Sequence, residues 1–292
     1  MRDFSQDHRW LSINTATVRQ QRGQDWPLLE ILDACAARGI RAVSPWRDQV
    51  AAAGLQPTAQ RLTSHGLELS GYCRGGMFTY TDAASRQAVR DDNKRALDEA
   101  CTLGAPCLVL VVGGLPGALA GKAAHRDIAG AREQVTEGIA ALLEDARERR
   151  MPLAIEPLHP MYAADRACIN TLEQALEVCD TLDPTRSGAL GVAVDLYHVW
   201  WDPKLLPMIE RAGKQRLLAF HVCDWLTPTT HLLEDRGMMG DGVIDVPQIR
   251  EMVEAAGYEG FTEVEIFSAA NWWKRPMHET LAVCQERLAT VT

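Results

Sequence analysis

Four residues with metal-binding side chains lie at or near the ends of short apolar runs in the second half of the chain. They are Glu156 after LAI, Asp195 after GVAV, His221 within LLAFHVC and Glu265 within FTEVEI. Three carboxylates and one imidazole make an oxygen-rich donor set, which suits one divalent ion. We expect Mn²⁺, with Mg²⁺, Co²⁺ and Zn²⁺ as alternatives. Each residue alone could instead be a helix cap or an ion-pair partner, so this interpretation requires a fold that brings all four together.

The pattern of apolar runs predicts such a fold. The expected strands cover residues 10–18, 40–46, 67–73, 107–112, 152–156, 191–195, 217–223 and 261–266. The expected helices cover about 27–38, 55–65, 82–103, 125–150, a segment starting near 171, 204–212, 247–256 and 276–290. Eight strand-then-helix units without a linker or a change in composition are typical of an α/β protein with the (β/α)₈ TIM-barrel fold. We therefore expect one barrel domain over residues 1–292. The alternative is an open, doubly wound sheet, but no G-x-G-x-x-G follows the first strand, which disfavours a dinucleotide site.

Several local signals set the predicted boundaries. Gly39 and Gly66 are expected to end the first two helices, because glycine readily adopts the left-handed conformation found there. The segment Arg74-Gly75-Gly76 is expected to be a loop after the third strand. Asn170, with Glu173 in the first turn, resembles an N-terminal helix cap.

In a TIM barrel, functional residues gather where the strands end at the carboxyl face. Strands five to eight would therefore deliver the four candidate ligands to one rim. In the eighth strand, Glu263 and Glu265 share a face because they are two residues apart. Glu265 is nearer the end and is assigned as the ligand, whereas Glu263 would lie deeper, as a supporting or ion-pair residue.

Further residues near the strand ends are candidates for substrate binding. His159 and His198 each follow a proposed ligand by three residues and could donate hydrogen bonds or move protons; loop packing is the alternative role. Arg74 and Arg47 are candidates either to bind an anionic substrate or to pair with acids of the rim. Tryptophans at or beyond predicted strand ends could wall a sugar ring, pack at the rim or form a subunit interface. These tryptophans are Trp46, Trp200, Trp225, Trp272 and Trp273.

Composition narrows the class of protein. The net charge of −9 disfavours a nucleic-acid-binding surface. Eight cysteines without a C-x-x-C pair indicate buried thiols in a reducing compartment. The first residues lack an apolar signal core, and no run reaches the ~18 apolar residues of a membrane span. We therefore expect a cytoplasmic protein that binds no membrane. The tryptophans and long helices allow self-association, and we expect a homo-oligomer, either a dimer or a tetramer.

The chain resembles the xylose isomerase-like TIM barrels over nearly its whole length. The resemblance is carried by IEP at 155–157, VDLYH at 194–198, FHVCD at 220–224 and EVEIFS at 263–268. Residues 236–242, RGMMGDG, are similar to the RG-x-x-G-x-G segment of the ketose epimerases, although extra residues around 226–234 precede them.

The resemblance implies a metal-dependent reaction on a small carbohydrate. A divalent ion held by the four ligands would polarise a carbonyl, and Glu156 and Glu265 would act as base and acid on opposite faces of the substrate. His198 and Arg236 would bind substrate hydroxyls or share in proton transfer. Removal of a proton next to that carbonyl would leave an enediolate, and return of a proton to it would complete an isomerisation or epimerisation.

Other functions remain open. A leaving group next to the reacting carbon would make the protein a lyase or dehydratase acting on a keto-sugar, keto-inositol or 3-keto-glycoside. The related DNA-repair nucleases carry additional His and acidic ligands, and we do not find that fuller set in this sequence. A non-catalytic sugar-binding subunit is a third possibility, but such a subunit has no need for a pair of glutamates.

Overall fold

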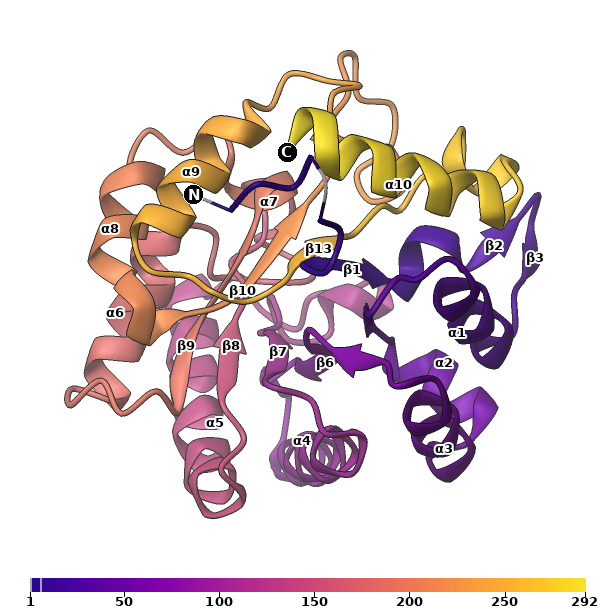
Figure 1. The fold of residues 1–292 in the computed structure, drawn as a ribbon. Coiled ribbons are helices and arrows are strands. Elements are labelled where there is room, and N and C mark those ends of the chain that lie inside the picture. Colours follow the sequence, from indigo (N-terminus) through magenta and orange to yellow (C-terminus); the bar gives the residue numbers. More distant parts are fainter. Residues whose placement is uncertain (1, 6) are drawn as a thin grey trace.

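Nine parallel strands form one nearly closed barrel in the computed structural model, which describes residues 2–5 and 7–292 (Figure 1). The strands are β1 (Leu11–Asn14), β4 (Ala42–Ser44), β5 (Glu68–Leu69), β6 (Tyr72–Gly76), β7 (Leu108–Val111), β8 (Leu153–Ile155), β9 (Leu190–Asp195), β10 (Leu217–Val222) and β13 (Thr262–Val264). Their order around the sheet is β5-β4-β1-β13-β10-β9-β8-β7-β6. Because β5 and β6 follow each other at the third position, the nine strands occupy eight places. The predicted (β/α)₈ barrel is confirmed.

The long helices surround the barrel on its outside, whereas the short α7 follows β9 directly at the carboxyl end of the barrel (Figure 1). The helices are α1 (Leu28–Ala37), α2 (Arg47–Ala53), α3 (Leu55–His65), α4 (Ala83–Leu103), α5 (Ile128–Arg149), α6 (Leu172–Leu182), α7 (Leu196–Val199), α8 (Leu205–Arg216), α9 (Val246–Ala255) and α10 (Met277–Val291). Short 3₁₀ helices lie in the connections at Thr15–Val18, Ala118–Ala120, Pro160–Tyr162 and Trp272–Lys274. Every residue of β7, β8 and β9 is buried, as expected for strands covered by helices on one face and by the barrel interior on the other.

The first and third strands differ from the prediction. The first ends at Asn14 instead of residue 18, because the Asn14 side chain accepts the Ala16 backbone N–H at 3.1 Å and starts a 3₁₀ helix. The segment 74–76 is not a loop but the end of β6, where Gly75 and Gly76 pair with Leu110 and Val111 of β7. A Cβ on Gly76 would lie 2.1 Å from the Val111 carbonyl oxygen, so glycine is what allows these two strands to approach.

Helix ends agree with the glycine signals and disagree with one predicted cap. Gly39 follows α1 with φ at 72°, and Gly66 caps α3 in the left-handed conformation, as predicted. The cap of α6 is Thr171, whose side chain accepts the Gln174 N–H, so the assignment of Asn170 was wrong. Asn170 instead donates to the carbonyls of Leu158 and Ala167 and holds the preceding loop.

The long connection after β10 is an organised loop. Within it, β11 (Asp224–Trp225) pairs antiparallel with β12 (Arg236–Gly237). The Asp224 carboxylate accepts the backbone N–H groups of Gly240, Gly242 and Ile244 at 2.8–3.0 Å. These bonds fix the loop so that Arg236 lies over the carboxyl end of the barrel.

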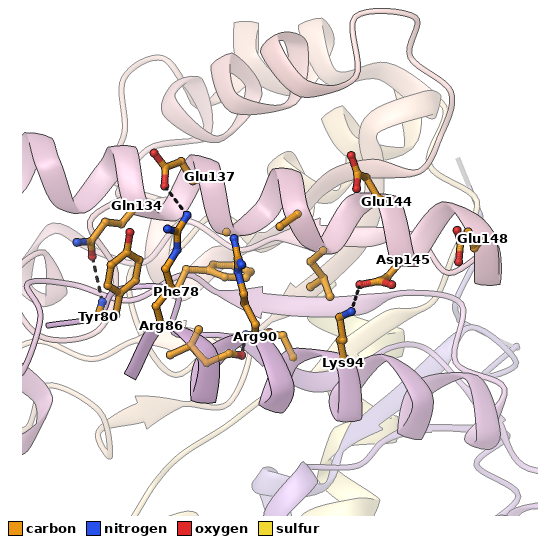
Figure 2. A pocket seen from close by; sticks show the side chains of 15 residues that line it. Phe78, Tyr80, Arg86, Arg90, Lys94, Gln134, Glu137, Glu144, Asp145 and Glu148 are labelled. Carbon is orange, nitrogen blue, oxygen red and sulfur yellow. Dashed lines mark hydrogen bonds and ion pairs between the residues drawn. The ribbon is translucent and has the colours of Figure 1, made fainter. Parts of the chain in front are cut away.

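A cavity of about 380 Å³ lies on the outside of the barrel between α4 and α5 (Figure 2). Ion pairs cross it, from Arg86 to Glu137 at 3.2 Å and from Lys94 to Asp145 at 3.2 Å. Its side chains come mainly from the two helices, and the candidate ligands lie elsewhere.

Among the described residues, no helix is both long and apolar enough to cross a membrane. Seven of the eight cysteines are buried, as predicted, and Cys101 is half-buried.

Candidate metal centre and active site

The four candidate ligands converge at the carboxyl end of the barrel. Glu156 follows β8, Asp195 ends β9, His221 lies in β10 and Glu265 follows β13. One ligand atom from each lies within 4.8 Å of all the others, and all four residues are buried. Neighbouring parallel strands therefore bring together side chains that are up to 109 residues apart in the sequence, from Glu156 to Glu265.

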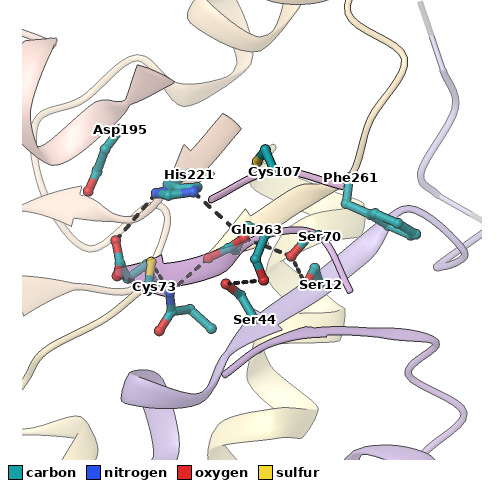
Figure 3. Close-up of polar contacts among 12 residues, drawn as sticks. Ser12, Ser44, Ser70, Cys73, Cys107, Asp195, His221, Phe261 and Glu263 are labelled. Carbon is teal, nitrogen blue, oxygen red and sulfur yellow. Dashed lines mark hydrogen bonds and ion pairs between the residues drawn. The ribbon is translucent and has the colours of Figure 1, made fainter. Parts of the chain in front are cut away.

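His221 is held between carboxylates on both sides of its ring. Its Nδ1 lies 3.1 Å from Glu156 Oε1 and 3.5 Å from Glu265 Oε2. Its Nε2 lies 3.6 Å from Glu263 Oε2, on the other side of the ring (Figure 3). A histidine that binds a metal usually directs its second nitrogen to a carboxylate, which fixes the ring. Nδ1 is thus positioned as the ligand atom and Glu263 as the group that orients the ring.

Glu263 is itself fixed by neutral donors from the opposite side of the barrel. Asn14 Nδ2 donates to Glu263 Oε1 at 2.7 Å. Ser70 Oγ donates to Glu263 Oε2 at 2.7 Å (Figure 3). The same Asn14 Nδ2 also donates to Glu265 Oε1 at 2.9 Å. Asn14 therefore links the deeper glutamate to the candidate ligand.

Arg236 supplies positive charge directly to the cluster. Its Nη1 lies 2.9 Å from Asp195 Oδ2 and 3.3 Å from Glu265 Oε2. Its guanidinium also stacks on Tyr197 and Phe267, with 4.5 and 5.2 Å between its carbon and the ring centres. The side chain is buried, so its charge acts on the carboxylates with little screening by water.

The carboxylates differ in how well their charge is compensated. Burial raises the pKa of Glu265 to about 7, although Arg236 and His221 oppose this, and burial also raises the pKa of Glu156. For Asp195, burial also favours the neutral form, but Arg236 and His198 outweigh it and lower the pKa to about 2. Burial lowers the pKa of His221, yet the surrounding glutamates raise it well above its ordinary value.

These properties fit a divalent cation. The two glutamates have too little positive charge nearby to favour their ionised forms, and a cation among the four atoms would restore that balance. His221 Nε2 is buried with no hydrogen-bond partner among the described residues, only Glu263 at 3.6 Å, and a metal on Nδ1 would strengthen that contact. The donor set of three carboxylates and one imidazole suits Mn²⁺ and similar ions.

A cavity of about 560 Å³ opens onto this cluster and reaches both candidate catalytic glutamates. The predicted substrate-binding residues that line it are Trp46, Arg74, His198 and Arg236, together with Glu156 and Glu265. His159 is not among the lining residues: its ring stacks on Trp225 with 4.9 Å between ring centres. His159 therefore lies behind the cavity wall and does not line the cavity with the other predicted residues.

His159 instead positions His198. The His159 backbone N–H donates to His198 Nδ1 at 3.2 Å. The other ring nitrogen, Nε2, lies 3.2 Å from Arg236 Nη2 and 3.6 Å from Asp195 Oδ2. Burial lowers the pKa of His198 to about 3, so the ring is neutral near pH 7.

Of the five tryptophans considered as walls for a sugar ring, only Trp46 lines the cavity. Trp272 and Trp273 are buried, and Trp273 Nε1 donates to the Ala16 carbonyl at 2.8 Å. Trp200 and Trp225 pack against each other, with 5.8 Å between ring centres. These four residues do not line the cavity, and their contacts fit the alternative role of packing at the rim.

Sequence reasoning missed Asn14 and Tyr162. Asn14 joins two glutamates and accepts the Trp46 indole N–H at 2.8 Å. It ends the first strand, so the same rule that identified the acids could have identified it. Tyr162 lines the cavity from a 3₁₀ helix after β8 and donates to the Leu232 carbonyl, and no simple sequence pattern marks it.

Comparisons with known proteins agree with this architecture. A family model described as xylose isomerase-like TIM barrel matches residues 32–286. A protein of known structure from Sinorhizobium meliloti 1021 is 56% identical, with 98% of this chain and 99% of that chain covered and a TM-score of 0.91. No curated protein matches in a sequence comparison.

Two more distant structures share the fold. The IolI protein, solved with a bound zinc atom, is 17% identical at a TM-score of 0.79, covering 96% of this chain and 98% of that one. The 3-keto-D-glucoside 4-epimerase YcjR from E. coli is 17% identical at a TM-score of 0.72, covering 95% and 99%.

Proposed function

The chain belongs to the xylose isomerase-like TIM barrel family, and from this premise we propose that it is a divalent-metal-dependent isomerase or epimerase of a ketose or keto-polyol. The residues proposed to hold the metal are Glu156, Asp195, His221 and Glu265. The substrate is proposed to occupy the cavity above them. An epimerase and a zinc-containing protein among the structural relatives support this proposal.

One observation carries the proposal: two candidate ligands, Glu156 and Glu265, also line the cavity. A purely structural metal site has no need to expose carboxylates to a substrate cavity. Here two glutamates from different strands face the same space next to the proposed metal. This arrangement suits a pair of groups that remove and return a proton.

When bound, a divalent ion would act as a Lewis acid on a substrate carbonyl and make the adjacent C–H more acidic. One glutamate would accept that proton, leaving an enediolate of the substrate, and a proton would return from the other glutamate. Return of the proton to the neighbouring carbon gives an isomer, and return to the other face of the same carbon gives an epimer.

His198 and Arg236 would orient the substrate. Both line the cavity, and Arg236 Nη2 lies 3.2 Å from His198 Nε2. Arg236 is pinned by Asp195 and Glu265, so its direction is fixed before a substrate enters. A preorganised pair of this kind would hold hydroxyl groups at little entropic cost.

The experiment is an incubation in D₂O with Mn²⁺ and a panel of ketoses, keto-inositols and 3-keto-glycosides, followed by NMR and mass spectrometry. Deuterium at a single carbon with no other change in mass is expected, and its position distinguishes isomerase from epimerase. Loss of water or of an aglycone would instead assign the lyase alternative. Absence of exchange with every substrate, in protein shown to contain the metal, would contradict the proposal and favour a sugar-binding subunit.

A further inference from the structure

We propose that the substrate carries a carboxylate and that Arg74 binds it, so that the protein acts on an anionic sugar derivative such as a ketouronate. This inference rests on the proposed function and narrows its substrate class. It follows from the way in which positive charge is distributed around the cavity.

Arg74 is the arginine of the cavity that lacks a partner. It lines the same space as Glu156 and Glu265. Among residues 2–5 and 7–292, its guanidinium makes no ion pair within 4.0 Å and no hydrogen bond. Burial lowers the pKa of Arg74, which reflects a charge removed from water without full compensation. An anion placed in the cavity would supply the missing partner.

The other arginines that line the cavity are all paired. The pairs are Arg19 with Asp48 at 2.5 Å, Arg47 with Glu99 at 2.7 Å and Asp92 at 3.0 Å, Arg166 with Asp165 at 2.7 Å, and Arg236 with Asp195 at 2.9 Å. Asp48 and Asp92, the acids at the rim of the cavity, are thus already neutralised. Among the described residues, no carboxylate lies within ion-pair distance of Arg74, although each of the other four arginines has at least one.

The position of Arg74 is fixed by its strand. It lies at a register shift in the middle of β6, and the residues on both sides of it, Cys73 and Gly75, pair with Val109 and Leu110 of β7. Asn93 of α4 clamps this strand: its Nδ2 donates to the Gly76 carbonyl at 2.7 Å, and its Oδ1 accepts the Gly76 N–H at 2.6 Å. A cation on a rigid strand is preorganised for a ligand, in contrast to an arginine on a loose loop.

A carboxylate fits this site better than a phosphate. The planar guanidinium matches a carboxylate through two parallel hydrogen bonds, and a single free cation balances a single negative charge. Phosphate sites usually add several backbone N–H groups or further cations. In this cavity the remaining arginines are occupied, and Glu156 and Glu265 would repel a dianion.

The test compares D-fructose with D-fructuronate, which differ only in a terminal carboxylate. Deuterium exchange in the Mn²⁺-loaded protein is expected to show a higher kcat/KM for D-fructuronate. Arg74→Gln should lower that value roughly 10- to 100-fold, since a charge-assisted pair is lost, and change the D-fructose value less than about threefold. The kcat/KM of Arg74→Lys for D-fructuronate should lie between those of the wild type and Arg74→Gln, because lysine keeps the positive charge but lacks the planar guanidinium. Arg166→Gln is the matched control: it removes a paired charge from the same cavity and should preserve the preference.

A second readout needs neither metal nor turnover. Calorimetric binding of D-gluconate and D-glucitol to the wild-type protein should favour gluconate, and the preference should be lost in Arg74→Gln. Equal binding of both compounds, equal effects of Arg74→Gln and Arg166→Gln, or a higher kcat/KM for D-fructose 6-phosphate than for D-fructuronate would each overturn the inference. If no sugar exchanges but gluconate binds through Arg74, the proposed function fails while the carboxylate site stands.

Discussion

The Nε2 atom of His221 lies 3.6 Å from the Oε2 atom of Glu263, on the side of the imidazole that faces away from Glu156. Glu263, within β13, and Glu265, just after it, therefore have different roles. Glu265 faces the cavity as a candidate ligand, and Glu263 faces the barrel interior and orients the histidine.

Replacing Glu263 with Gln should weaken divalent metal binding about 10- to 100-fold, because the ring of His221 loses the carboxylate that fixes it. Titration of the metal-free protein with Mn²⁺ by calorimetry measures this directly. Ser12→Ala is a suitable control, since the Ser12 hydroxyl is hydrogen-bonded to Ser70 and, among the described residues, not to the Glu263 carboxylate. Unchanged affinity in Glu263→Gln would show that His221 is oriented by other contacts.

Replacing Arg236 with Gln should destabilise the metal-free protein by about 3–5 kcal/mol, because Asp195 and Glu265 lose their buried counter-charge. Saturating Mn²⁺ should reduce this loss, since the ion would supply positive charge to the same carboxylates. Urea unfolding with and without Mn²⁺ gives both values. Arg166→Gln, whose pair is half-exposed, should cost no more than about 1 kcal/mol in either condition. If Arg236→Gln lowered the free energy of unfolding equally with and without Mn²⁺, Arg236 and the ion would not act on the same carboxylates.

The barrel fold could be predicted from the sequence because apolar strands and helices alternate regularly along the chain. The four candidate ligands could also be predicted, since each lies at or near the end of one strand and a barrel brings those ends to one rim. The end of the third strand could not be predicted, because the sequence Arg74-Gly75-Gly76 is typical of a loop. Only the close approach of the Val111 carbonyl, seen in the structure, explains why glycine is needed within this strand. Nor could the sequence distinguish Trp46, which lines the cavity, from Trp273, which packs below the rim. That difference depends on tertiary contacts of chain segments over 200 residues apart.

Two glycine substitutions separate backbone strain from steric exclusion. Gly188→Ala should cost about 1–2 kcal/mol, because φ is +83° there and no atom lies within 4 Å of the new Cβ. Gly76→Ala should cost about 1–3 kcal/mol more, because φ is +108° and the Cβ would meet the Val111 oxygen at 2.1 Å. The free energies of unfolding in urea provide the comparison. Equal losses would mean that β6 and β7 can separate without penalty.

The buried pair of Asp183 and Arg216, 3.0 Å apart, should make stability depend on pH. Burial favours the neutral acid, but Ser187 and Arg216 outweigh it and lower the pKa of Asp183. Since the folded pKa lies below the unfolded value of about 3.9, the stabilisation is complete above pH 4 and is lost as the pH falls through the folded value. Wild type should therefore lose more stability than Asp183→Asn between about pH 4 and pH 2. Parallel curves for the two proteins in acid unfolding would contradict this assignment.

The most direct measurement of the central claim is anomalous diffraction from crystals grown with Mn²⁺. The account predicts one strong peak among the ligand atoms of Glu156, Asp195, His221 and Glu265, with the Nδ1 side of the histidine facing the ion. The peak should disappear in His221→Ala and persist in Arg74→Gln. No peak at this position in the wild-type protein, or a peak elsewhere in the chain, would contradict the metal centre and the reaction proposed to depend on it.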